Sequence, residues 1–383
     1  MASLRTAPIF SLRLLIHEPA RLWASIGGVT FALLLMLLQV GFRNALLDSA
    51  LQLLRSLDAD IIVMDKEKKP FLARVGMAKE RLYQAQSIVG VESAAPLWLS
   101  MLQWKNMEDG TVHPIRVVGL DPDSPTFLQS EVNALIGLLR QPGTALIDSR
   151  SRSSYGYVGR GMAQVGRTEI EIVGTFPLGT DFEVDGTILV SEETYFKLTK
   201  YQRFQTHKLI EVALLKLGPD ADEEAVLASL AHHLPTDAVA LSKQQLIERD
   251  LEHWKSGTPI SVILMVGVAL GFAVGVVICY QILYTEVLDH LTEFATLKAI
   301  GYSDRYIQIA VVVEAWVLSI FGFLPAMAIG WTMLETLRQL SGLPAGLGVD
   351  DAVTILILSI TMCTLAGILA LRKVRVLDPA ELF

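Results

Sequence analysis

Residues 256–285 read SGTPISVILMVGVALGFAVGVVICYQILYT, a run without a charged side chain that lies between Lys255 and Glu286. An α-helix rises about 1.5 Å per residue, so about 20 apolar residues cross the hydrocarbon core of a bilayer. The run is longer than that minimum, which predicts a helix that is tilted or that extends into water. This stretch therefore places at least part of the chain in a membrane.

Three further runs are long and apolar enough to cross a membrane. They extend over 22–42, 306–334 and 352–371, and the one charged side chain inside them is Glu314. The composition agrees with a chain that lies partly in a bilayer, because 52% of the residues are hydrophobic and only 19% are charged, against about 25% charged in soluble proteins. We therefore predict an α-helical membrane protein with four transmembrane helices.

The first of these runs has an alternative interpretation as a cleaved signal peptide, because basic residues precede it. Its apolar length exceeds the roughly 7–15 residues of a typical signal, and no clear small-x-small cleavage site follows. Residues 44–57 instead continue with apolar side chains at helical spacing. These observations favour an uncleaved anchor whose helix continues out of the membrane.

The long polar stretch between the first and second runs predicts a mixed α+β domain inserted between the first two transmembrane helices. It contains no cysteine, so its core must be stable without disulfides. The turn Glu108-Asp109-Gly110 lies between two β-like runs and indicates a hairpin. The predicted strands are 59–64, 94–104, 113–119, 144–148, 168–175, 187–190, 209–216 and 239–241, and the predicted helices are 78–86, 222–233 and a last one capped by Ser242 and ending near 255.

Four transmembrane helices place both termini on the same side of the membrane, and basic residues indicate which side. The short loop 335–351 carries only Arg338, whereas basic residues cluster at both ends of the chain, namely Arg5, Arg13, Arg21, Arg372, Lys373 and Arg375. Because cytoplasmic segments are enriched in Lys and Arg, we expect cytoplasmic termini and an extracytoplasmic α+β domain.

This topology predicts nine segments along the chain. They are a cytoplasmic N-terminal segment (1–21), the first transmembrane helix with a stalk helix (22–57), the extracytoplasmic domain (58–241), a stalk helix with the second transmembrane helix (242–285), a cytoplasmic loop (286–305), the third transmembrane helix (306–334), a short external loop (335–351), the fourth transmembrane helix (352–371) and a cytoplasmic tail (372–383). A joint is expected near Gly257 and Pro259, between the second stalk helix and its transmembrane helix.

The sequence contains none of the common catalytic, cofactor or metal motifs. It has no GxxxxGK[ST] P-loop, no HExxH and no GxSxG, and Cys279 and Cys363 lie far apart inside apolar runs. His232 and His233 are adjacent, so on a helix their side chains do not face each other. We therefore predict no catalytic, cofactor-binding or metal-binding residues in this chain. The net charge of −8 also argues against nucleic acid as a partner.

Two features within the predicted spans are candidates for a special role. Glu314 is an intramembrane carboxylate nine residues from Arg305, about 13 Å along a helix, and we favour packing or helix pairing over a proton or substrate role. Gly267, Gly271 and Gly275 share one helix face and allow another helix to approach closely. That approach can occur within one subunit, or at a dimer or substrate-facing seam.

The loop between the second and third spans carries the most informative short segment. Residues 286–305 read EVLDHLTEFATLKAIGYSDR, in which apolar Leu291, Phe294, Leu297 and Ile300 recur every three residues. The pattern predicts a short amphipathic helix, which can lie on lipid or dock into a groove of a soluble partner. The small number of basic residues argues against a simple lipid anchor.

This segment and the order of the spans resemble those of a known family. EFATLKAIGY, residues 293–302, resembles the coupling-helix motif of ABC permeases of the MacB/FtsX type, whose layout is also one span, a large extracytoplasmic domain and then three spans. Other segments resemble the DevC subfamily, the permease of DevBCA-type exporters. They are QVGFRNALLDSA (39–50), LDAD (57–60), QWK (103–105), TP (258–259), YQILY (280–284), DH (289–290) and RKVRVLDPAELF (372–383).

The resemblance implies a homodimeric permease of the cell inner membrane with a separate ATPase subunit that binds ATP. Glu293, Phe294, Leu297, Lys298 and Tyr302 would lie in or beside the groove of that ATPase. The resemblance also implies a periplasmic adaptor on the external domain and a TolC-like outer-membrane channel. ATP-driven closure of the ATPase would move the external domains through the coupling helix, a process called mechanotransmission. Glycolipids or other hydrophobic molecules would be the cargo class, but the cargo itself is not implied.

Two other classes of function remain as alternatives. An FtsX-like signalling protein would use the same layout to regulate a periplasmic partner such as a cell-wall hydrolase, without transport. An intramembrane enzyme would need catalytic side chains that converge within the bilayer, and Glu314 has no second acidic residue inside the spans. The sequence therefore favours a permease over a signalling protein, and a signalling protein over an enzyme.

Overall fold

The computed structural model describes residues 19–156, 159–200, 208–292, 296, 300 and 302–374. Most of the predicted terminal segments 1–21 and 372–383 therefore lies outside the described residues. The chain divides into two compact units: a helical unit of Met1–Asn44, Pro259–Thr336 and Ala345–Phe383, and an α+β unit of Ala45–Thr258 and Leu337–Pro344.

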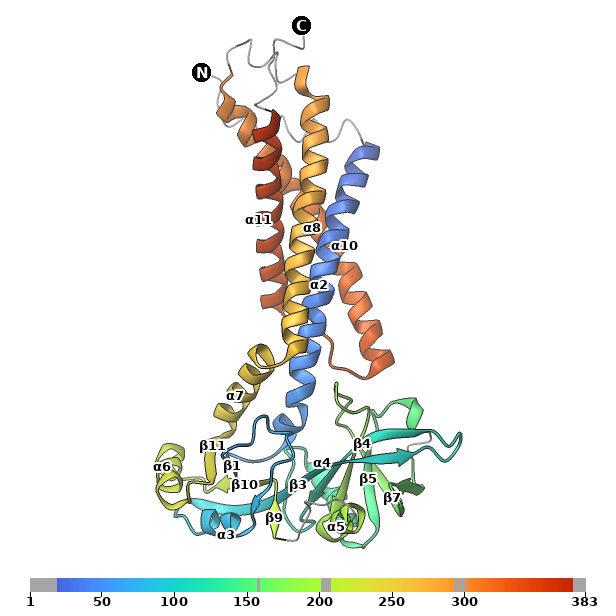
Figure 1. Cartoon of the computed structure of the whole chain (residues 1–383), viewed down its shortest axis with the longest axis vertical. Helices are drawn as coiled ribbons and strands as arrows, with labels where there is room; N and C mark the ends of the chain where they lie inside the picture. Colours follow the sequence, from blue (N-terminus) through green and yellow to red (C-terminus); the bar gives the residue numbers. More distant parts are fainter. Residues whose placement is uncertain are drawn as a thin grey trace. The chain divides into compact units, whose positions relative to one another are not determined.

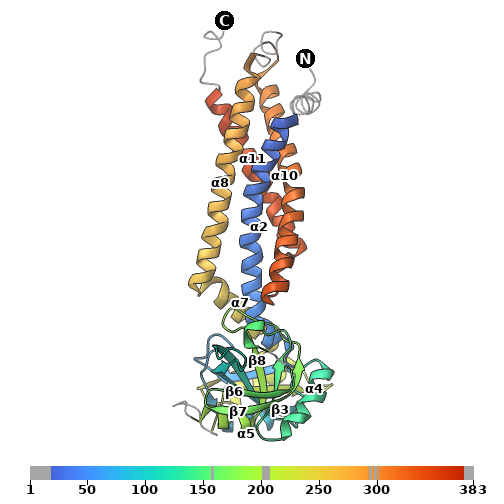
Figure 2. The same ribbon diagram turned by 90° about the vertical axis from the view of Figure 1, so that its right-hand side faces the viewer.

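Four long helices make up the described part of the helical unit and lie side by side (Figures 1 and 2). They are α2 (Pro19–Ser56), α8 (Pro259–Asp289), α10 (Asp304–Ser341) and α11 (Val349–Val374). Each contains a stretch that is long and apolar enough to cross a membrane. The prediction of four transmembrane helices with an α+β domain between the first and the second is confirmed.

Two predicted helix boundaries are also confirmed. The first helix, α2, continues without a break to Ser56, so residues 44–56 extend the first span as expected. The helix α7 (Lys243–Ser256) begins with a capping box between Ser242 and Gln245. It ends at Gly257, and Pro259 opens α8 at the position where a missing N–H group costs nothing.

Polar and small side chains join α11 to its neighbours in the helical unit. The Ser319 and Ser359 hydroxyl groups lie 2.7 Å apart between α10 and α11. The Trp316 indole donates a hydrogen bond to the Thr364 hydroxyl at 2.9 Å. The sulfur atoms of Cys279 and Cys363 lie 3.6 Å apart between α8 and α11. Short polar contacts of this kind stabilise helix packing where no water competes for the hydrogen bonds.

The α+β unit is built on one nine-stranded sheet among the described residues, in the order β11-β1-β10-β3-β4-β8-β5-β7-β6. The strand β6 also pairs with the end of β3, so β6 is not a free sheet edge. The strands are β1 (Ile61–Asp65), β3 (Val91–Lys105), β4 (Val112–Leu120), β5 (Thr144–Asp148), β6 (Gly161–Val165), β7 (Thr168–Phe176), β8 (Thr187–Ser191), β10 (Val212–Leu217) and β11 (Ala238–Ser242), and β2 (Met77–Ala78) pairs separately with β9 (Leu209–Ile210).

Both faces of this sheet are buried, because side chains alternate along each strand and helices cover both sides. Ile61 and Val63 of β1 belong to one apolar cluster, whereas Ile62 and Met64 belong to the other. The helices α3 (Glu80–Gln86), α5 (Glu192–Thr199) and α6 (Glu223–His233) contribute to the first cluster, and the end of α2, α4 (Ser130–Ile136) and α7 contribute to the second. The unit therefore forms its core without disulfides, as its lack of cysteine requires.

The predicted elements of this unit match the structure with two corrections. The predicted strand 209–216 is divided into β9 and β10, because Glu211 interrupts it and its carboxylate accepts a hydrogen bond from the Leu99 N–H at 3.1 Å. The predicted helix 78–86 begins only at Glu80, since Met77 and Ala78 pair with β9. The elements β6, α4 and α5 were not predicted, and all three are short.

A buried lysine makes the stability of the α+β unit depend on pH. Lys68 is fully buried, and its ammonium group donates hydrogen bonds to the carbonyls of Ala73 and Val75. Burial lowers its pKa from 10.5 to about 8, although the carboxylates of Glu211, Asp250 and Asp65 act in the opposite direction. The unfolded chain therefore binds more protons than the folded chain between these two values, so stability rises with pH in this range.

We expect the free energy of unfolding of the α+β unit to increase by about 1.5 kcal/mol between pH 8 and pH 9.5 because of this one group. Pulse proteolysis of the full chain in detergent across a urea titration measures it. In Lys68→Met the increase should disappear, because no proton is exchanged at that position. An equal increase in the wild type and in the variant would show that another group is responsible.

Candidate coupling site

The five residues predicted to couple to an ATPase are only partly covered by the structure. Glu293, Phe294, Leu297 and Lys298 lie outside the described residues, whereas Tyr302 is described. The coupling role of these four residues therefore stays a prediction. The site is built from what surrounds them, namely the end of α8, the start of α10 and the end of α11.

Two hydrogen bonds connect the described residues Thr292, Thr296 and Ile300 of this loop, one between backbone groups and one from a side chain to the backbone. The Ile300 N–H donates to the Thr296 carbonyl at 3.0 Å, and the Thr296 hydroxyl donates to the Thr292 carbonyl at 2.8 Å. The backbone bond spans four residues, which is the spacing of an α-helix. Ile300, one of the apolar residues of the predicted docking face, is 71% exposed. An exposed apolar side chain at this position is available to a membrane or to a partner.

Tyr302 joins the loop to the first turn of α10. Its ring centroid lies 4.7 Å from that of Tyr306, with an angle of 59° between the planes, and both rings pack beside Ala310. Tyr306 is buried and Tyr302 is half-buried. Tilted aromatic pairs at this distance are attractive beyond their apolar burial. Tyr302 is therefore in direct contact with the first turn of α10.

A second buried cluster connects the three helices near the same loop. Val287 of α8, Ile307 and Val311 of α10 and Leu371 of α11 form it. The ends of the three helices are therefore in close-packed contact through these side chains. The sequence did not single out these residues, since apolar positions near the ends of apolar runs look ordinary.

Glu314 lies on the face of α10 that also carries Tyr306 and Ala310, because the three positions are spaced by four residues. Its side chain is only 3% exposed. Among the described residues, no group of three or more His, Cys, Asp and Glu side chains is arranged to hold a metal ion. The carboxylate is thus a buried polar group about two helical turns further along α10 than Tyr306.

The glycines of α8 face α2 of the same chain. A Cβ atom added to Gly267 would lie 2.7 Å from Gln39 Cδ, and one added to Gly271 would lie 2.9 Å from Met36 Cγ. A Cβ atom on Gly275 would overlap Met362 Sδ of α11. These distances are shorter than carbon side chains tolerate, so the three glycines permit a close helix–helix contact within the chain.

The helix α2 also contacts α10, at two further glycines. Gly322 approaches Val29 and Thr30, and the Thr30 hydroxyl donates a hydrogen bond to the Gly322 carbonyl at 3.1 Å. Gly330 approaches Leu37. The helix α2 therefore lies against both α8 and α10.

Comparisons with known proteins place this part of the chain in context. Residues 265–379 match the family model described as FtsX-like permease C-terminal. No curated protein matches the sequence. The match covers most of α8, the loop, α10 and α11, which is the region that contains the candidate coupling site.

Two solved structures are similar to about half of the chain. The periplasmic region of MacB from Actinobacillus actinomycetemcomitans is 8% identical, covers 50% of this chain and 91% of its own length, and has a TM-score of 0.36. The extracellular domain of the noncanonic ABC-type transporter YknZ from Gram-positive bacteria is 10% identical, covers 48% and 98%, and has a TM-score of 0.32. TM-scores this low do not support a conclusion about this chain.

The family match supports the FtsX-like part of the predicted resemblance, whereas the DevC subtype stays a prediction. The family match includes the loop whose sequence motif suggested coupling. The last three candidate spans and the two loops between them are therefore similar to the C-terminal part of FtsX-like permeases.

Proposed function

We propose that this chain is the permease subunit of an ATP-driven ABC efflux complex. The observation that supports the proposal most is the FtsX-like permease match over residues 265–379, in a chain that carries an α+β domain between its first and second candidate spans. The sequence contains no P-loop, so ATP would be bound and hydrolysed by a separate subunit. The chain itself would supply no catalytic residue and no cofactor site.

In this proposal the ATPase acts on the loop between α8 and α10. Phe294 and Leu297 would insert into a groove of the ATPase, and Glu293 and Lys298 would pair with charged groups at its rim. Closure of the ATPase dimer would displace the loop. The Tyr302–Tyr306 contact and the cluster around Val311 would carry the displacement into the helix ends.

The helix α2 would then carry the movement to the α+β domain. It packs against the glycine face of α8 and continues as one helix to Ser56, inside the α+β unit. A continuous helix transmits displacement along its axis, because its hydrogen bonds keep its length constant. To change a two-state domain arrangement from 1:99 to 99:1, the ATPase must favour one state by about 10⁴-fold. That requirement sets the scale of the coupling.

The wider assembly follows from the resemblance. The chain would form a homodimer in the cell inner membrane, with both termini in the cytoplasm and the α+β domain in the periplasm. A periplasmic adaptor would rest on that domain, and a TolC-like channel would complete the path for a lipid, glycolipid or other hydrophobic cargo. The DevC-like segments, which include residues 39–50 and 280–284, support this form of the complex.

A second candidate function is regulation of a periplasmic partner without transport. The description of the matched family names no cargo, and FtsX-like signalling is the alternative that the sequence left open. Affinity purification of the tagged full chain from native membranes, followed by mass spectrometry, separates the two functions. A P-loop ATPase together with a periplasmic adaptor is the result expected for efflux. The ATPase together with a cell-wall hydrolase, and without an adaptor, would move the conclusion to signalling. No ATPase in either case would contradict both.

A further inference from the structure

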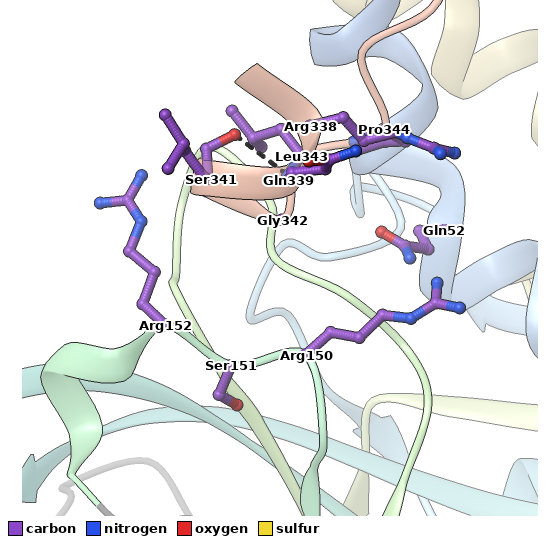
Figure 3. Close-up of a pocket in the computed structure, with 11 residues that line it drawn as sticks. Gln52, Arg150, Ser151, Arg152, Arg338, Gln339, Ser341, Gly342, Leu343 and Pro344 are labelled. Atoms are coloured by element: carbon purple, nitrogen blue, oxygen red, sulfur yellow. Dashed lines mark hydrogen bonds between the residues drawn. The ribbon is translucent and has the colours of Figure 1, made fainter. Parts of the chain in front are cut away.

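The α+β unit contains a pocket with three arginine side chains in its lining. Its volume is about 590 Å³, and its walls include Gln52, Arg150, Arg152, Arg338, Ser341 and Gly342 (Figure 3). Three distant segments supply them: the end of α2, the loop after β5, and the end of α10 with the loop that follows. None of the described residues that line the pocket is acidic.

Hydrogen bonds hold the two sides of this pocket in place. The fully buried Asp148 carboxylate accepts from the N–H groups of Arg150 at 3.0 Å, Leu178 at 2.9 Å and Gly179 at 2.7 Å. The Thr180 hydroxyl donates to the Ser341 carbonyl at 2.8 Å, which connects the opposite wall. The backbone that carries the arginines is thus preorganised, so a ligand would not have to order it.

Gly342 is required where these walls meet. Its φ of +73° lies in the left-handed region that favours glycine. A Cβ atom there would lie 3.0 Å from Thr180 Oγ1 and 3.2 Å from the Arg150 carbonyl oxygen. The loop after α10 can therefore approach the Arg150 segment closely only because this residue has no side chain.

Arg150 and Arg152 differ in how far they are already paired. The Arg152 guanidinium forms an ion pair with Asp185 at 3.1 Å. Arg150, in contrast, forms no ion pair with any residue that the structure describes. In Figure 3 the two side chains extend from either side of Ser151, with Arg150 toward Gln52. A cationic donor group is therefore open on the Gln52 side of the pocket.

Gln52 contributes an acceptor to the same side. Its amide nitrogen donates to the Leu178 carbonyl, which fixes the orientation of the amide. Its Oε1 atom is buried and has no hydrogen-bond partner among the described residues. A buried polar atom without a partner is costly, so a ligand hydroxyl group that reached it would be favoured. The pocket thus combines guanidinium donors with one amide acceptor.

Arg338 follows the third apolar run closely in the sequence. Arg338 lies only four residues after Leu334, where the third apolar run ends, about 6 Å along a helix. It is also the only basic residue of loop 335–351. Short loops on the translocated side of a membrane carry few basic residues, so this arginine departs from the usual pattern.

We propose that this pocket binds a phosphate ester that also bears a free hydroxyl group, such as a phosphoglycerol headgroup. Guanidinium groups bind phosphate through paired hydrogen bonds, and Arg150 with Arg338 would supply them. Gln52 Oε1 would accept from the hydroxyl group. The pocket volume is within the range of small-molecule sites. The same chemistry can come from a lipid or from a soluble ester, and the proposal does not rest on coupling to an ATPase.

The experiment measures ligand binding to the full chain in phosphatidylcholine nanodiscs. In one arm phosphatidylglycerol is added, and the lipid retained after stringent washing is counted by native mass spectrometry. In the other arm radiolabelled glycerol 3-phosphate is used in equilibrium dialysis. The variants are Arg150→Gln, Arg338→Gln and Arg150→Lys. The control is Arg140→Gln, which removes an arginine that pairs with Asp123 and lies outside the pocket.

We expect Arg150→Gln and Arg338→Gln each to weaken binding at least about tenfold, as loss of a charge-assisted contact does. Arg150→Lys should retain part of the binding affinity, because the positive charge remains but the paired hydrogen-bond geometry of a guanidinium is lost. An effect confined to phosphatidylglycerol identifies a lipid, and an effect on glycerol 3-phosphate identifies a soluble ester. Failure of both ligands to bind, or equal weakening in Arg140→Gln, would overturn the proposal.

Discussion

Phe294→Asp is expected to abolish the stimulation of the partner ATPase while the permease remains folded in the membrane. Phe294 lies in the middle of the apolar row Leu291, Phe294, Leu297 and Ile300. In a docked coupling helix the central aromatic side chain would contribute at least about 2 kcal/mol of binding, as such anchors do. A carboxylate at this position would lose that contribution and add the cost of burying a charge. Together these effects should reduce docking by more than 30-fold.

The ATPase activity of the purified complex in nanodiscs measures this effect, with and without the permease. Thr296→Asp is the matched control, because Thr296 is exposed and does not belong to the apolar row of the predicted helix. It introduces the same charge two residues away, and it should leave stimulation within about twofold of the wild type, since surface substitutions change free energies little. Full stimulation in Phe294→Asp would contradict the coupling role of this loop.

Arg116→Met is expected to destabilise the α+β unit by about 3–5 kcal/mol. Arg116 lies on β4 with 5% of its surface exposed, and its guanidinium pairs with the buried Asp181 and, at 3.3 Å, with Glu183. Methionine fills a similar volume, so the cost would come mainly from the Asp181 carboxylate, which would remain buried without its cation. A loss of this size is a large fraction of the stability of a domain.

Pulse proteolysis of the full chain across a urea titration measures the change in the free energy of unfolding. The double variant Arg116→Met with Asp181→Asn should recover part of the loss, because it removes the uncompensated charge. The recovery will be incomplete. The amide oxygen of Asp181→Asn can still accept from the N–H groups of Glu183 and Val184, which bond Asp181 Oδ1 at 2.8 Å, but hydrogen bonds to a neutral amide are weaker than those to a carboxylate. A single-variant cost below about 1 kcal/mol would show that the pair is effectively solvated.

The parts of the fold that depend on local patterns could be predicted from the sequence. Long apolar runs predicted the four helices, and the continued helical spacing after Phe42 predicted that α2 extends beyond its span. The Ser242 cap and the Gly257–Pro259 joint were also predicted, because caps and prolines act on their immediate neighbours.

The parts that depend on long-range contacts could not be predicted. The pairing of β6 with β3 closes the sheet between residues about 60 positions apart, and no local pattern specifies it. Similarly, the pocket combines Gln52, Arg150 and Arg338, and the sequence indicates these only as an ordinary glutamine, one residue of an SRSR run and an unusual loop arginine. The partner of the α8 glycines was also open, because a small-residue face fits any close helix.

Site-specific photo-crosslinking tests most directly whether loop 286–305 contacts an ATPase. Phe294 is replaced by a photoreactive phenylalanine analogue in the full chain, native membranes are irradiated, and the adducts are identified by mass spectrometry. The same analogue at Trp331, a 62% exposed residue within α10, is the control. An adduct with a P-loop ATPase is expected from position 294 and none from position 331. Lipid adducts alone from both positions would contradict it.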